Sequence, residues 1–169
     1  MVDPKMINTV AQKYEEENYN FRTYLKTNAD PKELDTQFLK LHKELFDGYD
    51  CCMCNNCCRT YAITLNDEDV NRISQHLGKT RDDFVSQYLK KSEFDEAVHV
   101  MEKIPCIFLC EDGKCSINEV KPIECKAFPF TDQPNKLDSL LGVIDFAEEC
   151  PVVFEILERL KVIYRFRRK

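Results

Sequence analysis

Apolar residues recur at helical spacing within the first 47 residues of the chain. Asp30-Pro31-Lys32-Glu33 is typical of a helix start, because Asp can cap the helix and Pro suits its first position. One apolar stripe follows, made of Leu34, Phe38, Leu41 and Leu45. Asp3-Pro4 begins a similar stretch with Met6, Val10 and Tyr14. The pattern predicts two helices within residues 1–47, the second over 31–47 before Gly48, and we expect them to be a lid or a partner surface.

Helical periodicity returns after residue 65. Asn66 can cap a helix that ends at Gly78, and Thr80 with Asp83 forms a capping box for a second helix. Pro151 begins a C-terminal helix with one apolar face, made of Val153, Ile156, Leu157, Leu160 and Tyr164. The acidic triplet 67–69 lies in a first helical turn, so we expect it to complement the helix dipole rather than to bind a cation.

Two stretches favour strands. Residues 97–109 are rich in β-branched and apolar residues, and 140–146 predict another short strand. The turn signal Glu111-Asp112-Gly113-Lys114 would place Cys110 and Cys115 opposite each other at the base of a hairpin, with both thiols facing one ion. The fold class predicted is α+β: a mostly helical small domain with a short β-hairpin and Cys-rich loops around a metal centre. We expect a single domain over 1–169, with a helical extension (1–48), a cysteine-cluster core (49–150) and a C-terminal helix (151–169).

Composition excludes several classes of function. The chain has 169 residues, of which only four are glycine, and neither a dinucleotide-binding nor a P-loop motif can be written in it. The formal net charge of −6 argues against nucleic-acid binding, and no apolar run approaches the roughly 20 residues that span a membrane. The basic residues that end the chain are best explained as complementing a helix C-terminus: Arg165, Arg167, Arg168 and Lys169.

The ten cysteines are the strongest signal in the composition. Residues 1–17 lack the features of a secretory signal, so we expect a cytoplasmic protein whose thiols are kept reduced. Metal ligation then explains clustered cysteines better than disulfides do. No catalytic motif is identifiable, and with so many thiols a histidine ligand is not required: His42 and His76 suit surface or helix-end roles, and His99 alone lies near the later cysteines.

The cysteines fall into two groups and two single residues. The first group is a Cys-x2-Cys-x2-Cys run, Cys51, Cys54 and Cys57, followed by Cys58. The second group is Cys106, Cys110, Cys115 and Cys125. Cys150 precedes a proline, as the last cysteine of a bacterial ferredoxin run does, and is either a ligand or a core residue. Cys52 is best explained as a buried small hydrophobe.

These motifs resemble the CxxCxxCC (YkgJ-type) cysteine-cluster family of zinc- or iron-chelating proteins. The run from Cys51 to Cys58, followed by Arg59, matches its signature, and the segment 113–129, with Lys121-Pro122-x-x-Cys125-Lys126, is similar to its second motif. The family usually has arginine at positions 121 and 126 and tyrosine at Asn118, so bidentate or stacking contacts would be lost here. The resemblance covers residues 51–150 and implies metal or iron–sulfur binding.

Spacing favours iron over zinc. Structural zinc is commonly held by two Cys-x2–4-Cys knuckles, whereas the second group has gaps of three, four and nine residues. We therefore expect one [4Fe–4S] cluster, or two, in an electron-transfer protein or an accessory subunit of a complex with a protein partner. A zinc-stabilised protein-interaction module is one alternative. Flagellin lysine methylases contain a cysteine-cluster module related to this family, so a second alternative is the cysteine-cluster component of a methyl-transfer system. The predicted metal ligands are Cys51, Cys54, Cys57, Cys58, Cys106, Cys110, Cys115, Cys125 and Cys150.

Overall fold

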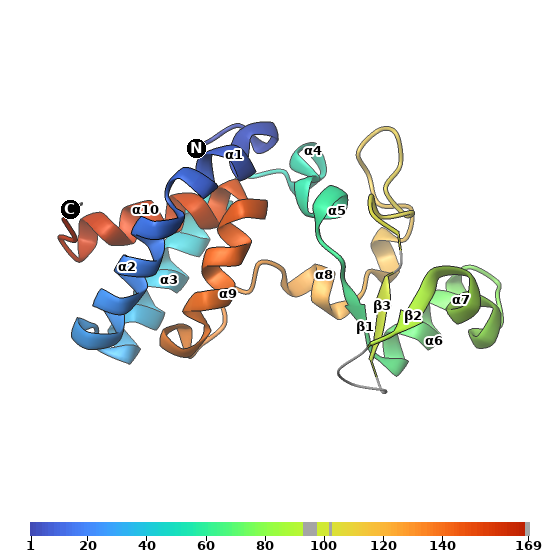
Figure 1. Ribbon diagram of the computed structural model, residues 1–169. Helices are drawn as coiled ribbons and strands as arrows, with labels where there is room; N and C mark the ends of the chain where they lie inside the picture. The colour runs from blue at the N-terminus through green and yellow to red at the C-terminus, as the bar shows by residue number, and fades with distance from the viewer. Residues whose placement is uncertain (93–97, 102, 168–169) are drawn as a thin grey trace. The chain divides into compact units, whose positions relative to one another are not determined.

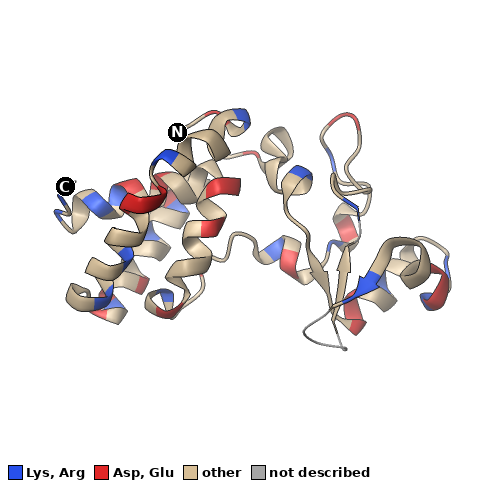
Figure 2. Ribbon diagram, in the orientation of Figure 1, with Lys and Arg blue, Asp and Glu red and all other residues tan. Residues whose placement is uncertain are grey.

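The computed structural model describes residues 1–92, 98–101 and 103–167, and these form two compact units (Figure 1). One unit combines Met1–Asp50 with Pro129–Lys169 and is helical. The other, Cys51–Phe128, contains nine of the ten cysteines, and we call it the cysteine unit. The expected extension and C-terminal helix thus belong to one unit. Figure 2 shows acidic and basic residues interspersed along the helices of the helical unit.

The helical unit is built around one central helix. A 3₁₀ turn (η1, Pro4–Met6) leads into α1 (Ile7–Lys13), α2 (Glu15–Asn28) and α3 (Pro31–Phe46). After the cysteine unit the chain returns as α9 (Lys136–Glu149) and α10 (Pro151–Ile163), and α9 packs against α1, α2, α3 and α10. The start of α9 is fixed by Asp35 on α3, whose carboxylate accepts hydrogen bonds from the amides of Asn135 and Lys136 at 2.9 and 2.8 Å.

Local signals predicted the third and last helices of this unit well. Asp30 caps α3 by accepting a hydrogen bond from the amide of Glu33 at 2.9 Å, as expected. The predicted stripe of α3 is buried in full, and so is most of the predicted face of α10. The described part of the basic end follows α10, while Arg168 and Lys169 lie outside the described residues.

Two predictions in this unit were wrong. The first predicted helix is interrupted at Tyr14, and its buried face is offset by one residue: Ile7 and Ala11 are buried, whereas Met6 is 51% exposed. Residues 140–146 are not a strand but the middle of α9. A short apolar run fits a buried helix as well as a strand. Here the buried positions have helical spacing: Leu140, Val143, Ile144 and Ala147.

The cysteine unit consists of short elements around a small sheet. Its order is α4 (Cys51–Cys54), α5 (Asn56–Thr60), β1 (Thr64–Leu65), α6 (Asp67–His76), α7 (Arg81–Tyr88), β2 (Leu89–Lys91), β3 (His99–Met101), η2 (Asn118–Val120) and α8 (Ile123–Ala127). The strands are antiparallel in the order β1-β3-β2, with Thr64 opposite Val100 and Leu89 opposite Met101. Of the stretch 97–109 only β3 is a strand among the described residues.

Packing in the cysteine unit follows the predicted caps. Asn66 accepts from the amide of Asp69 at 2.8 Å and Thr80 from that of Asp83 at 3.1 Å, so α6 and α7 begin where expected. Their apolar sides form one core with the sheet: Leu65, Val70, Ile73, Phe84, Leu89, Met101, Phe108 and Ile117. The observed architecture is a mostly helical α+β fold, which confirms the fold class. Within the described ranges, none of the helices combines the length and the apolar character that crossing a membrane requires.

Candidate metal centre

Seven of the ten cysteines line one cavity in the cysteine unit. The cavity has a volume of about 110 Å³. Its thiol-bearing residues are Cys51, Cys52, Cys57, Cys58, Cys106, Cys115 and Cys125. Apolar and aromatic side chains supply much of the remaining wall, with Ile63, Met101, Phe108, Ile117 and Phe128 among them. The fold therefore brings thiols from both sequence groups to one largely apolar space.

Asn55 joins the two short helices that carry the first group. Its backbone is left-handed (φ 39°), so the chain turns between α4 and α5 instead of continuing as one helix. Its side-chain amide donates to the carbonyl of Cys52 at 3.1 Å and accepts from Nε of Arg59 at 2.6 Å. The predicted loop therefore consists of two short helices joined by a turn at Asn55. This turn lets both members of the pairs 51–52 and 57–58 line the cavity.

The hairpin of the second group exists, but its register differs from the prediction. Leu109, not Cys110, is opposite Cys115, and the amide of Cys110 instead donates to the carbonyl of Lys114 at 2.8 Å across the turn. Side chains alternate along paired strands, so this shift separates the two thiols. Cys115 lines the cavity, whereas Cys110 is exposed and is not part of its lining.

Backbone contacts fasten the second group to the first. The amide of Cys106 donates to the carbonyl of Cys58 at 2.8 Å. Gly113, at the hairpin turn, approaches α4 so closely that a Cβ atom there would lie 2.7 Å from the carbonyl oxygen of Cys52. With φ at 82°, glycine is required at this turn for its conformation as well as for its size.

Two carboxylates hold the segment that precedes Cys125, and sequence reasoning missed both. Asp69 is 2% exposed, pairs with Arg72, and accepts from the amide of Ile123 at 3.2 Å. Glu124 accepts from the hydroxyl of Tyr61 at 2.8 Å. It also accepts two hydrogen bonds from Thr64. The triplet 67–69 suggested helix-dipole complementation alone, and only its third member is buried.

The thiols differ in their acidity. The hydrogen bond from Cys57 lowers the pKa of Cys58 to about 6 against the opposing effect of burial, with help from the charges of Lys121 and Arg59. Burial, reinforced by neighbouring thiols, raises the pKa of Cys125 to about 12. Burial also raises the pKa of Cys106 and that of Cys115. In the metal-free chain Cys58 is therefore a thiolate at neutral pH, while metal binding must displace protons from the buried thiols.

The donor set fits a thiolate-bound metal centre. The soft donors in the cavity lining are seven cysteines and the thioether of Met101, and the lining contains no histidine. Lys103 and Lys121 also line the cavity, where their charges offset those of thiolates. Among the described side chains, no three from His, Cys, Asp or Glu are close enough together to hold one ion. The seven cysteines thus line one cavity, but their side chains do not form a preformed four-ligand site among the described residues.

A comparison with protein families identifies this unit. The CxxCxxCC family model, described as "Putative zinc- or iron-chelating domain", matches residues 50–151. The chain belongs to the CxxCxxCC family. The expected resemblance is confirmed, and the family description supports metal binding by a unit that contains the thiol cavity. No solved structure matches the chain.

Three predicted ligands of this CxxCxxCC protein lie outside the cavity lining. Cys54 is half-buried at the end of α4, and Cys110 is exposed at the hairpin. Cys150 belongs to the helical unit, where it is 8% exposed between α9 and α10. Conversely Cys52, which we expected to be a bystander, does line the cavity. The structure thus unites six of the nine predicted ligands and adds one cysteine.

The histidines contribute to the fold rather than to this cavity. His42 shares a 2.8 Å hydrogen bond with the hydroxyl of Thr131 inside the helical unit. His76 is exposed at the last turn of α6, as expected. His99 is buried in β3 and is not part of the cavity lining.

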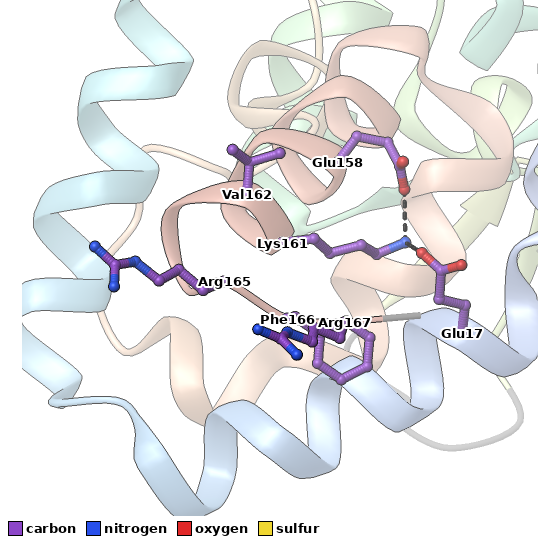
Figure 3. A pocket seen from close by; sticks show the side chains of 7 residues that line it. All are labelled: Glu17, Glu158, Lys161, Val162, Arg165, Phe166 and Arg167. Carbon is purple, nitrogen blue, oxygen red and sulfur yellow. Dashed lines mark hydrogen bonds and ion pairs between the residues drawn. The ribbon is translucent and has the colours of Figure 1, made fainter. Parts of the chain in front are cut away.

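A second, larger cavity of about 490 Å³ lies in the helical unit (Figure 3). Its central cation, Lys161, is buried and bonds to Glu17 at 2.8 Å and Glu158 at 2.5 Å. Figure 3 shows the side chain of Arg165 directed away from this group. The two glutamates therefore neutralise the charge of Lys161, and the ion pair with Glu17 connects α10 to α2.

Proposed function

We propose that this CxxCxxCC protein is a cytoplasmic iron–sulfur protein that holds a [4Fe–4S] cluster in the thiol cavity and exchanges electrons with a protein partner, as a carrier or as an accessory subunit. The observation that carries the proposal is the convergence of seven thiols on one apolar cavity. A bound [4Fe–4S] cluster would supply one-electron redox chemistry. Its thiolates would come from the cysteines that line the cavity.

The donor set favours a cluster over a zinc knuckle. Structural zinc sites take four ligands, often with histidine among them and usually from two paired knuckles. Here the cavity is lined by more than four thiols and by no imidazole, and the second group lacks a Cys-x2-Cys pair. Apolar side chains such as Phe108 and Ile117 limit the access of water, which is one of the determinants of a cluster's reduction potential.

Exposure at one edge supports exchange with a partner. Cys51 is exposed although it lines the cavity. Met53, its neighbour on α4, is 79% exposed. Methionine is enriched in protein interfaces because its flexible, polarizable side chain adapts to a partner surface. A centre in this cavity would therefore have a surface beside it onto which a partner could dock.

Anaerobic isolation followed by absorption and EPR spectroscopy tests the proposal. We expect a brown protein whose visible absorption bleaches reversibly on reduction with dithionite and whose reduced form gives an EPR signal. Cys115→Ala should lose these signals, whereas Cys110→Ala, a matched change on the same hairpin outside the cavity lining, should keep them. A colourless protein without iron or sulfide would refute the proposal. Stoichiometric zinc, with unfolding by chelator and no redox change, would identify the zinc module instead.

The same substitution series tests the other predicted ligands. Cys54→Ala and Cys150→Ala should keep the spectrum if the cavity lining is the ligand set. Loss of the spectrum in either variant, with the variant still folded, would show that the centre extends beyond this cavity.

A further inference from the structure

The side chain of Glu124, next to the cavity-lining Cys125, accepts three hydrogen bonds. Its Oε1 accepts from the hydroxyl of Tyr61 at 2.8 Å. Its Oε2 accepts from both the amide and the hydroxyl of Thr64, the latter at 2.5 Å. Burial, and then the hydrogen bond to Glu124, raise the pKa of Tyr61, so this hydroxyl stays protonated and donates. All three donors thus converge on one carboxylate.

The position of Glu124 in the chain makes this contact a link between the two cysteine groups. Tyr61 directly follows α5, which carries Cys57 and Cys58, and Thr64 begins β1. Both lie about 60 residues from Glu124 in the chain. Glu124 precedes Cys125 on α8. The ring of Phe128, at the end of α8, also packs on Tyr61 at 5.3 Å between centroids. Glu124 thus connects the residue next to Cys125 to the segment that follows the first group.

A second anchor holds the same segment from another side. Arg72 on α6 donates to the carbonyl of Lys121 at 3.0 Å, and Asp69 accepts from the amide of Ile123. These contacts fix the start of α8 against α6. The side-chain hydrogen bonds of Glu124 join α8 to the segment that follows α5.

We propose that Glu124 is a positioning residue of the metal centre, which holds Cys125 at the cavity without being a ligand. Glu124 is not part of the cavity lining. The proposal rests on the proposed function only in that a metal occupies the cavity. Groups that orient metal ligands typically contribute about 10–100-fold to metal affinity. Removing this carboxylate should therefore weaken metal retention by that factor.

Three variants separate positioning from mere charge. Glu124→Ala removes all three acceptor contacts. Glu124→Gln can keep them, because its carbonyl oxygen accepts from Thr64 and its amide can donate to the hydroxyl oxygen of Tyr61. Glu119→Ala removes an exposed carboxylate of η2 as the matched control.

The first readout is the rate at which metal leaves the isolated protein for an excess of chelator. We expect release about 10–100-fold faster in Glu124→Ala, with a changed absorption or EPR signature, and release close to wild type in Glu124→Gln and Glu119→Ala. Release and spectrum unchanged in Glu124→Ala would overturn the proposal. Equal losses in Glu124→Ala and Glu119→Ala would also overturn it, because the effect would then be one of charge alone.

The second readout needs no metal. In the metal-free, reduced chain, maleimide labelling mapped by mass spectrometry should show Cys125 labelled faster in Glu124→Ala than in wild type, while labelling of Cys110 stays constant. If the wild-type protein contained no metal, the proposed function would be refuted, but the labelling experiment would still test whether Glu124 positions Cys125. If Glu124→Ala does not fold, Thr64→Val removes one donor and should give a smaller change in the same direction. No change in either readout in Thr64→Val would then overturn the proposal.

Discussion

Gly113→Ala should separate the hairpin from the first cysteine group. Gly113 has φ 82°, and an added Cβ would lie 2.7 Å from the carbonyl oxygen of Cys52 and 2.9 Å from the side-chain nitrogen of Asn55. The left-handed conformation costs an alanine about 1–2 kcal/mol. Overpacking against a fixed backbone atom costs about 1–3 kcal/mol more. The cysteine unit should therefore lose about 2–5 kcal/mol of its free energy of unfolding.

Gly78→Ala is the matched control for this prediction. Gly78 lies in the same unit with φ 65°, but nothing lies within 4 Å of the Cβ that alanine would add. It should cost only the conformational part, about 1–2 kcal/mol. In calorimetry at matched metal content, Gly113→Ala should lower Tm clearly further than Gly78→Ala, since each kcal/mol is worth roughly 4–8 °C in a unit of this size. Equal shifts in the two variants would refute the close approach.

Three other predictions follow from buried or titrating groups. Asp69→Ala should destabilise the cysteine unit by about 1–3 kcal/mol in urea unfolding, because it removes the buried partner of the half-exposed Arg72 and leaves the amide of Ile123 without its acceptor; a loss below about 0.5 kcal/mol would contradict this. Lys161→Met should cost the helical unit about 1–3 kcal/mol, discounted because its glutamate partners are partly exposed; an unchanged Tm would refute a role in stability. A thiol becomes reactive above its pKa. In the metal-free chain, alkylation of Cys58 by iodoacetamide should therefore rise with a midpoint near pH 6, while Cys125 stays unreactive beyond pH 9. Equal pH dependence of alkylation at Cys58 and Cys125 would contradict these pKa values.

Helix starts were predictable because their chemistry is local. The caps at Asp30, Asn66 and Thr80 each bond an amide three residues ahead, so the signal is complete within four residues. The run 140–146 was mispredicted because its local pattern is ambiguous. Leu141 is apolar although it is 47% exposed, so this position does not show the polar side of the helix, and a short apolar run fits a strand as well as a helix.

The cavity was only partly predictable. The cysteine spacing indicated metal binding, which the family match supports, and the structure brings thiols of both groups to one cavity. The spacing did not distinguish Cys110 from Cys115, because a shift of one residue in hairpin pairing exchanges the two faces. Asp69 and Glu124 were missed because their partners lie 54 and about 60 residues away in the chain. A carboxylate whose hydrogen-bond donors lie that far away in the chain leaves no local sequence pattern by which it could be recognised.

Iron, sulfide and zinc content per chain, measured after strictly anaerobic isolation, tests the central claim most directly. An iron–sulfur centre in the thiol cavity predicts about four iron and four sulfide per chain for one [4Fe–4S] cluster, with little zinc. The same analysis of Cys125→Ala should show that content reduced. About one zinc per chain without iron or sulfide, or no metal at all, would contradict the account.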